Sequence, residues 1–182
     1  MTATGAVDLS GIVARCTFPP TGEHVDCAFS GGPDSTALIV LARAAGLDVT
    51  AHHVDHGIRP ESPADADRAA QIAQHVGVAF VSHTVSVPPG PNLEARARSA
   101  RFEALPGRVL TGHTADDQAE TTLLRLLRGS GSRGLSAMQP GPTHPLLAVR
   151  RSETEAVCAD AGIEPVHDRS NDTLDAWRNR IR

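Results

Sequence analysis

Short apolar runs and longer segments of helical spacing alternate along this chain. Four apolar runs have the length of strands: 25–29, 49–54, 78–87 and 108–111. Five segments between and after them have apolar residues at helical spacing: 34–45, 63–76, 93–105, 114–128 and 153–161. Four of these are followed at once by glycine, as helix ends often are. The alternation predicts a doubly wound α/β domain, a mainly parallel sheet with helices on both faces.

Polar, glycine-rich segments follow three of the predicted strands. They are SGGPDS at 30–35, HVDHG at 53–57 and GHTADD at 112–117. In parallel α/β sheets, ligands bind beyond the carboxyl ends of the strands. We therefore expect the three segments to meet in one site at that edge of the sheet.

The first of these segments has the features of a phosphate-binding loop. Two glycines allow a ligand to approach the backbone closely, and a proline fits the first turn of the following helix. The N–H groups of that turn carry the positive end of the helix dipole, and two serine hydroxyls add donors. The loop predicted to surround a phosphate consists of Ser30, Gly31, Gly32, Pro33, Asp34 and Ser35. The alternative is a plain strand-to-helix turn in which Ser30 or Asp34 caps the helix.

A carboxylate, Asp34, distinguishes this loop from the common nucleotide-binding loops. The segment matches neither the dinucleotide-binding pattern nor the lysine-containing P-loop, and the chain has no lysine at all. Any phosphate is therefore held by backbone N–H groups, arginine, histidine or a metal ion. A carboxylate beside phosphates is favourable when a divalent cation such as Mg²⁺ bridges them.

Carboxylates also gather at the start of the predicted helix 114–128. Asp116 and Asp117 stand four and three residues before Glu120, so all three can lie on one side of that helix. Their mutual repulsion favours a bound cation, either Mg²⁺ or an ammonium group. The alternative is a solvated acidic helix start.

Histidines near the strand ends allow a different interpretation. The group His53, Asp55, His56 and His113 has the residue types of a transition-metal centre, and hence of a metallohydrolase. That interpretation leaves the 30–35 segment unexplained. Beside a nucleotide, His56 and His113 are better explained as hydrogen-bond donors to adenine or phosphate.

The cysteines and one group of leucines are expected at core positions rather than at a reactive or metal-binding site. The three cysteines form no CxxC pair, which gives little support to a disulfide framework or an iron–sulfur site. Cys27 lies within an apolar run and is expected to be core. An apolar stripe on the helix 114–128 is also expected to face the core: Leu123, Leu124, Leu126 and Leu127.

The composition is that of a soluble globular protein. The chain has 182 residues, 40 % of them hydrophobic and 21 % charged, which suits one domain. No apolar run reaches the about 20 residues of a membrane-spanning helix, and the N-terminus lacks a secretory pattern, so we expect a cytoplasmic protein without membrane contact. The formal net charge of −4 argues mildly against nucleic-acid binding by this segment alone.

The 30–35 segment resembles the SGGxDS signature of the PP-loop ATP pyrophosphatases, which release pyrophosphate from ATP while adenylating a substrate. Four further segments resemble the tRNA(Ile)-lysidine synthetases within that superfamily: HVDHGIRPES at 53–62, NLEARARSARF at 92–102, GHTADDQAETTLLRLLRGSGSRGL at 112–135 and DRSNDTLDAWRNRIR at 168–182. The resemblance covers nearly the whole chain from residue 28 onward. It implies a Rossmann-like fold of the adenine nucleotide α-hydrolase type.

The resemblance also implies a reaction. ATP would adenylate the wobble cytidine of an isoleucine tRNA with a CAU anticodon, and free lysine would then displace AMP. Asp34, Asp117 and Glu120 are the implied catalytic residues. Asp34 and Asp117 would hold Mg²⁺, and Asp117 and Glu120 would hold the lysine. Arg96 and Arg101 are implied contacts to the substrates.

Two other functions remain open at this point. A PP-loop tRNA thiolase generally needs paired cysteines or a sulfur carrier, and a non-catalytic ATP-binding module has no use for the carboxylates of 116–120. One position departs from the resembled family, because His144 stands where an arginine is frequent.

We expect one catalytic domain over 1–182, with a core at about 24–145 and a helical extension at 146–182. The tRNA-binding C-terminal domains of the family are expected to be absent from this chain, and a homodimer is left open.

Overall fold

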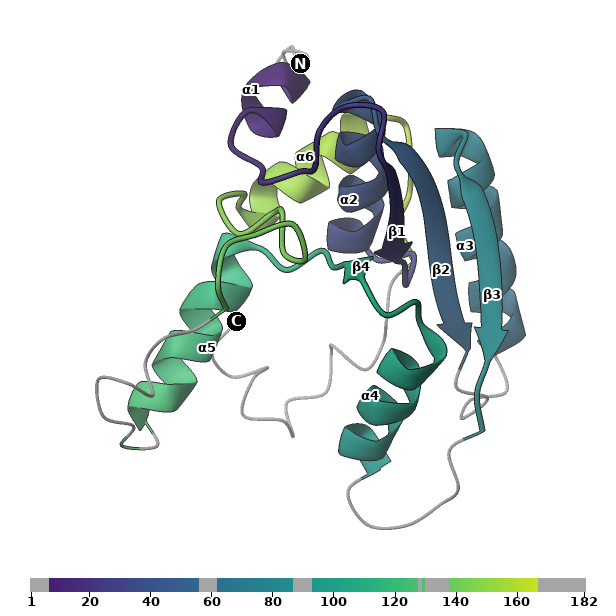
Figure 1. Ribbon diagram of the computed structural model, residues 1–182, viewed down its shortest axis with the longest axis vertical. Coiled ribbons are helices and arrows are strands. Elements are labelled where there is room, and N and C mark those ends of the chain that lie inside the picture. Colours follow the sequence, from purple (N-terminus) through teal and green to yellow (C-terminus); the bar gives the residue numbers. More distant parts are fainter. Residues whose placement is uncertain (1–6, 56–61, 87–92, 128, 130–137, 167–182) are drawn as a thin grey trace, which may run out of the picture.

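A parallel sheet forms the centre of the protein (Figure 1). The computed structural model describes residues 7–55, 62–86, 93–127, 129 and 138–166. Within these residues the sheet has four strands in the spatial order β3-β2-β1-β4. The strands are β1 (His24–Ala28), β2 (Asp48–Asp55), β3 (Ala79–Thr84) and β4 (Val109–Leu110). All pairings are parallel, so the predicted α/β fold is confirmed.

Each helix expected from the sequence is present. The helices in the described part of the chain are α1 (Leu9–Val13), α2 (Pro33–Ala44), α3 (Ser62–Val76), α4 (Leu93–Ala104), α5 (Ala115–Leu127) and α6 (Arg151–Asp160). Only α1 was not predicted, because its five residues are too few to show a helical period. Its start is held by the Asp8 carboxylate, which accepts the N–H of Gly11 at 2.9 Å.

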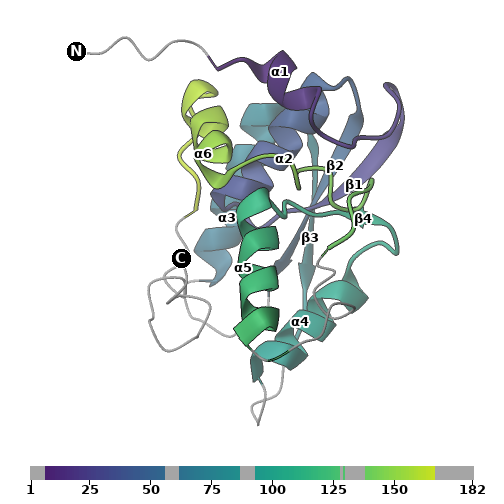
Figure 2. The same cartoon turned by 90° about the vertical axis from the view of Figure 1, so that its left-hand side faces the viewer.

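The hydrophobic core lies where α2 and α3 pack against the sheet. Residues that pair across a parallel sheet point to the same face, and Val25 and Cys27 of β1 pair with Val49 and Ala51 of β2. All four are buried, so the core position expected for Cys27 is confirmed. Helices α1 and α6 also pack against α2 (Figure 2), which makes α2 one of the most deeply buried elements.

The leucine stripe of α5 is not the core element that the sequence indicated. Only Leu124 is buried, whereas Leu123, Leu126 and Leu127 are 47 %, 51 % and 70 % exposed. The first turn of α5 lies beside α6, and the rest of the helix runs away from the sheet (Figure 1). The spacing of these leucines is helical, as predicted, but spacing alone does not tell which face of a helix is covered by the rest of the protein.

No helix in the ranges given above is long and apolar enough to cross a membrane.

Candidate functional site

The 30–35 segment forms a tight turn between β1 and α2. Gly31 has a φ of +83°, which glycine adopts without strain, and a Cβ there would lie 2.8 Å from Cγ2 of Val166. The N–H of Val166 donates to the Gly31 carbonyl at 2.8 Å. Gly32 is the N-cap of α2 and Pro33 its first residue. The positive φ of Gly31 and the place of Pro33 at the start of α2 match the glycine turn and the helix start expected from the sequence.

The serine hydroxyls of this turn lie together at the start of α2. The Oγ atoms of Ser30 and Ser35 are 3.1 Å apart, and the Ser35 hydroxyl donates to the Gly32 carbonyl at 3.0 Å. The N-cap, Gly32, makes no side-chain capping bond, so neither Ser30 nor Asp34 caps α2 as the alternative interpretation required. The turn therefore presents hydroxyl groups and the positive end of a helix dipole in one place.

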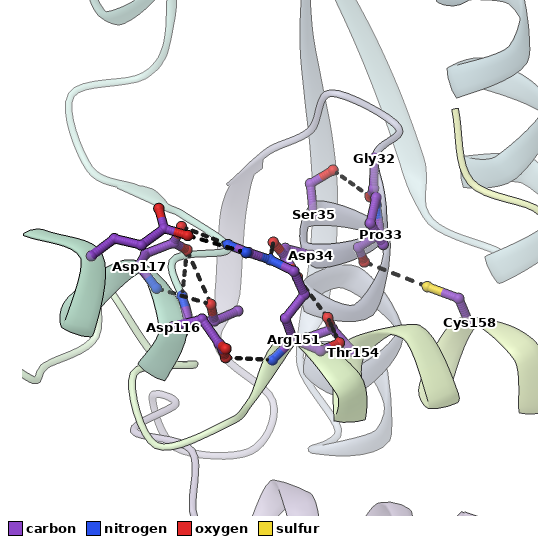
Figure 3. Close-up of polar contacts among 11 residues, drawn as sticks. Gly32, Pro33, Asp34, Ser35, Asp116, Asp117, Arg151, Thr154 and Cys158 are labelled. Atoms are coloured by element: carbon purple, nitrogen blue, oxygen red, sulfur yellow. Dashed lines mark hydrogen bonds and ion pairs between the residues drawn. The ribbon is translucent and has the colours of Figure 1, made fainter. Parts of the chain in front are cut away.

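Arg151, the first residue of α6, joins the loop carboxylate to those of α5 (Figure 3). Its Nη2 donates to Oδ1 of Asp117 at 3.0 Å, and its Nη1 donates to Oε1 of Glu120 at 3.3 Å. Its Nε lies 3.5 Å from Oδ2 of Asp34. Three carboxylates from two distant parts of the sequence thus meet at one guanidinium.

The third acid of α5, Asp116, has a different role. Its Oδ2 accepts the backbone N–H of Arg151 at 2.7 Å rather than contacting the guanidinium. This hydrogen bond satisfies a free N–H at the start of α6 and fixes the main chain that carries Arg151. The three acids do gather near one residue, but only two of them face its charge.

Two buried threonines hold the carboxylates in place. Thr154 donates its hydroxyl to Oδ1 of Asp34 at 2.5 Å, and Oδ2 of Asp117 accepts the N–H and the hydroxyl of Thr114 at 2.9 and 3.1 Å. Both threonines are fully buried. Burial raises the pKa of Asp34, against the opposing effects of the Thr154 hydrogen bond and the charge of Arg151.

Arg151 and Thr154 were missed in the sequence. The pattern predicts a helix that begins at residue 153, whereas α6 begins two residues earlier, at Arg151. One signal was available, because a chain without lysine must supply any cation beside these carboxylates from arginine or histidine. Nothing local in the sequence tells which arginine that is.

The remaining predicted site residues are two histidines and two arginines outside the carboxylate cluster. His56 lies outside the described residues. His113 follows β4, and its Nδ1 is 2.7 Å from the Thr111 hydroxyl. Arg96 and Arg101 lie on α4, and the charge of Arg101 reaches His53 at the end of β2, where it adds to the burial that lowers the pKa of that histidine.

The described residues, which do not include His56, give no support to the transition-metal interpretation. Nδ1 of His53 is 3.0 Å from the Phe29 carbonyl, and its ring stacks on Phe80 with centroids 6.2 Å apart. Among the residues that the structure describes, no three or more His, Cys, Asp or Glu side chains are arranged to hold a metal ion. His53 is therefore a packed and hydrogen-bonded histidine within this part of the chain.

Comparison with known proteins places the chain in a family. Residues 9–182 match the PP-loop domain. A curated tRNA(Ile)-lysidine synthase of Novosphingobium aromaticivorans is 40 % identical over 98 % of this chain and 62 % of its own length. Those of Nocardia farcinica and Rhodococcus erythropolis are 43 % and 46 % identical over 91 % and 88 % of this chain, and over 55 % and 52 % of their own length. The chain thus spans little more than half the length of these relatives.

A solved structure supports the fold. The U34-tRNA thiolase NcsA from Methanococcus maripaludis, which carries a [4Fe-4S] cluster, superposes with a TM-score of 0.69 at 15 % sequence identity, over 96 % of this chain and 69 % of that one. At this identity the similarity concerns the fold alone. The domain match over residues 9–182 shows that the chain belongs to the PP-loop family.

Proposed function

We propose that this chain carries the catalytic chemistry of a tRNA(Ile)-lysidine synthase. The reaction is the ATP-dependent ligation of lysine to the wobble cytidine of an isoleucine tRNA with a CAU anticodon. The observation that carries the proposal is the convergence of Asp34 with Asp117 and Glu120 on one cationic side chain. The curated relatives described above, at 40 %, 43 % and 46 % identity, bear this name and support it.

The loop before α2 would bind ATP through its phosphates. Ser30 and Ser35 offer hydroxyl groups 3.1 Å apart, and the first turn of α2 offers N–H groups and its dipole. No P-loop lysine is needed for this contact, and the chain has none. Binding there brings the phosphates beside Asp34, the second residue of α2.

Asp34 and Asp117 would hold Mg²⁺ beside those phosphates. Both carboxylates already approach the same cation, with Asp34 Oδ2 3.5 Å from Nε and Asp117 Oδ1 3.0 Å from Nη2 of Arg151. Mg²⁺ in such sites is commonly held by one or two carboxylates together with phosphate oxygens and water, and the donor set fits that pattern. The ion would neutralise charge as pyrophosphate leaves.

Asp117 and Glu120 would hold the ammonium group of lysine. Both now accept N–H groups of Arg151 at 3.0 and 3.3 Å, which is the contact that a protonated amine would make. If the ammonium takes those oxygens, the charge of Arg151 becomes available to the triphosphate. Correct placement of the amine, rather than a covalent enzyme intermediate, would supply most of the acceleration.

The thiolase alternative is less consistent with the cysteines. Thiolation chemistry uses thiolates or metal-bound thiolates. Burial raises the pKa of Cys27 to about 12 and that of Cys16 and Cys158 to about 11, so all three are thiols at neutral pH. None forms a disulfide in the structure. The non-catalytic alternative accounts for the three carboxylates only as ion-pair partners of Arg151.

Pyrophosphate release tests the proposal. The chain is mixed with ATP, Mg²⁺ and the CAU isoleucine tRNA, with and without lysine, and with a glutamine tRNA as control. We expect release that requires the isoleucine tRNA, and incorporation of labelled lysine into that RNA. Glu120→Gln leaves both proposed Mg²⁺ ligands in place, so it should lose lysine incorporation yet keep ATP affinity. ATP binding without any release from the correct tRNA would overturn the assignment for this chain.

A further inference from the structure

One side of α5 carries apolar side chains that the described residues leave open. Leu123 and Leu126 are 47 % and 51 % exposed, and Ala119, one turn before Leu123, is exposed as well. Positions 119, 123 and 126 are spaced i, i+4 and i+7, so their side chains form one stripe along the helix. We call these three residues the α5 stripe. Leu124, which points to another side of α5, is buried and does not belong to it.

The α5 stripe lies where α5 has no described helix beside it. The first turn of α5 is joined to α6 by the contact between Asp116 and Arg151, and from there α5 runs away from the sheet (Figure 1). No other described helix runs along its second half, since α4, which overlaps α5 in Figure 2, lies apart from it in Figure 1. An amphipathic helix ordinarily buries its apolar stripe against another element. The occupant of this stripe must therefore be sought outside the described residues.

The sequence after Val166 contains a matching stripe. Leu174, Trp177 and Ile181 are spaced i, i+3 and i+7, which is the spacing of one face of a helix. From residue 172 onward, two aspartates precede three arginines, and this is the order of charges that a helix dipole favours. The segment 167–182 thus has the pattern of a short amphipathic helix, whose apolar side needs a partner.

The residue before this segment is anchored near the start of α5. The N–H of Val166 donates to the Gly31 carbonyl at 2.8 Å, in the turn that leads into α2. Asp34, three residues further on, approaches the same guanidinium that contacts Asp117 in the first turn of α5. The segment therefore departs from the end of the molecule at which α5 begins.

The length of the segment also fits α5. Leu174 comes eight residues after Val166, and Leu123 comes eight residues after Ala115, the first residue of α5. Eight helical residues rise about 12 Å, so a helix parallel to α5 brings the two stripes level. The arginines of the segment then lie beside the C-terminal end of α5, where the helix dipole favours positive charge.

We propose that the segment 167–182 docks as a helix on the α5 stripe, with Leu174 and Trp177 packed against Leu123 and Leu126. The docking needs neither ATP nor tRNA and is independent of the proposed function. A short tether gives the segment an effective concentration in about the millimolar range, so it occupies the stripe ahead of a second copy at micromolar protein. An RNA backbone is a poorer occupant, because its affinity comes from basic side chains and the stripe has none.

Fluorescence of Trp177 tests the docking, because it is the only tryptophan of the chain. In the full chain we expect emission at shorter wavelength than in the urea-unfolded chain, and weaker quenching by acrylamide, since the ring is covered. Leu126→Asp places a charge in the stripe and should shift the emission to longer wavelength while the urea unfolding transition is retained. Leu127→Asp places the same charge about 100° round the helix and should leave the emission unchanged. Wild-type emission at the wavelength of the unfolded chain would overturn the proposal.

A double-mutant cycle tests the contact between the two stripes. Leu123→Ala and Leu174→Ala should each lower the urea midpoint of the full chain. The double variant should lower it by less than the sum of the two losses, because either change alone removes the shared contact. Additive losses would overturn the contact. Emission that varies with protein concentration, together with dimers in sedimentation velocity, would overturn the assignment of the segment in favour of a second copy.

Discussion

Nη2 of Arg151 lies 3.0 Å from Oδ1 of Asp117, and this contact connects the first turn of α6 to the first turn of α5. The same guanidinium also approaches Asp34 at the start of α2. Three helix starts are thereby held around one positive charge. Carboxylates at helix N-termini are favourable with the helix dipole, but their mutual repulsion needs a cation.

Replacing Arg151 is expected to destabilise the protein as well as inactivate it. Arg151→Met removes the charge between partly buried carboxylates, and we expect the free energy of unfolding to fall by about 2–4 kcal/mol. Arg151→Lys keeps the charge but cannot reach three carboxylates with a planar fork, so an intermediate loss is expected. Urea unfolding at pH 7 measures the free energy of unfolding of both variants. Stability equal to wild type in Arg151→Met would show that the carboxylates do not need this cation.

The pH dependence of stability should report the raised pKa of Asp34. Below the ordinary pKa of an aspartate, the side chain is protonated in both states and contributes nothing. As pH rises, the unfolded chain ionises first, so the folded protein loses stability until pH passes the raised pKa of the folded state. The Asp34→Asn variant has no carboxyl group at this position, so it does not lose stability in this way as pH rises. Urea unfolding of wild type and Asp34→Asn from pH 3 to 7 should therefore show a difference that grows with pH in favour of the variant.

Thr154→Val provides a control for that experiment. The Thr154 hydroxyl donates to Oδ1 of Asp34 and opposes the rise in the pKa of Asp34. Removing it should raise the pKa of Asp34 further and enlarge the loss of stability with pH. A Thr154→Val profile parallel to wild type would mean that another group carries the pH dependence.

Two glycines differ sharply in their expected tolerance to alanine. A Cβ at Gly112 would lie 2.7 Å from the Asp34 carbonyl oxygen, whereas nothing lies within 4 Å of a Cβ at Gly107. We expect Gly112→Ala to shift α2 against the end of β4, destabilise the protein by about 1–3 kcal/mol and weaken ATP binding. Gly107→Ala should change neither. Calorimetric unfolding and ATP titration measure the two effects, and equal behaviour of the variants would contradict the close approach.

The leucines of α5 should fall into two classes. Leu124 is 8 % exposed, and Leu124→Ala is expected to cost about 2–4 kcal/mol of unfolding free energy. Leu127 is 70 % exposed, and Leu127→Ala should change stability by less than about 0.5 kcal/mol. Chemical unfolding of the two variants checks this. A large loss in Leu127→Ala would indicate that this face of α5 is covered in solution.

The 30–35 loop could be predicted from the sequence because its requirements are local. A positive φ at Gly31 and a proline at the first position of α2 depend on neighbouring residues only. The order of strands and helices was predictable for the same reason, since period and turn residues act within each segment. The convergence of the segments 30–35 and 112–117 followed from one general property of parallel sheets.

Other features depend on long-range packing and had no local signal. Arg151 meets Asp117 only because α6 packs on α2 and places its first turn beside that of α5. The leucine stripe of α5 carries a clear period, yet only tertiary structure decides that Leu124 is covered and Leu127 is not. The hydroxyl of Thr111 likewise contacts His144, which lies 33 residues further along the chain.

By itself, the sequence determined the α/β class, the order of the elements, the glycine turn before α2 and the residue types of the site. Each of these follows from steric and hydrogen-bonding preferences within a few residues. Only the tertiary structure decided which arginine stands between the carboxylates, which histidines share a hydroxyl and which leucines are buried. Those relationships depend on helix packing, which brings together groups that no local rule connects.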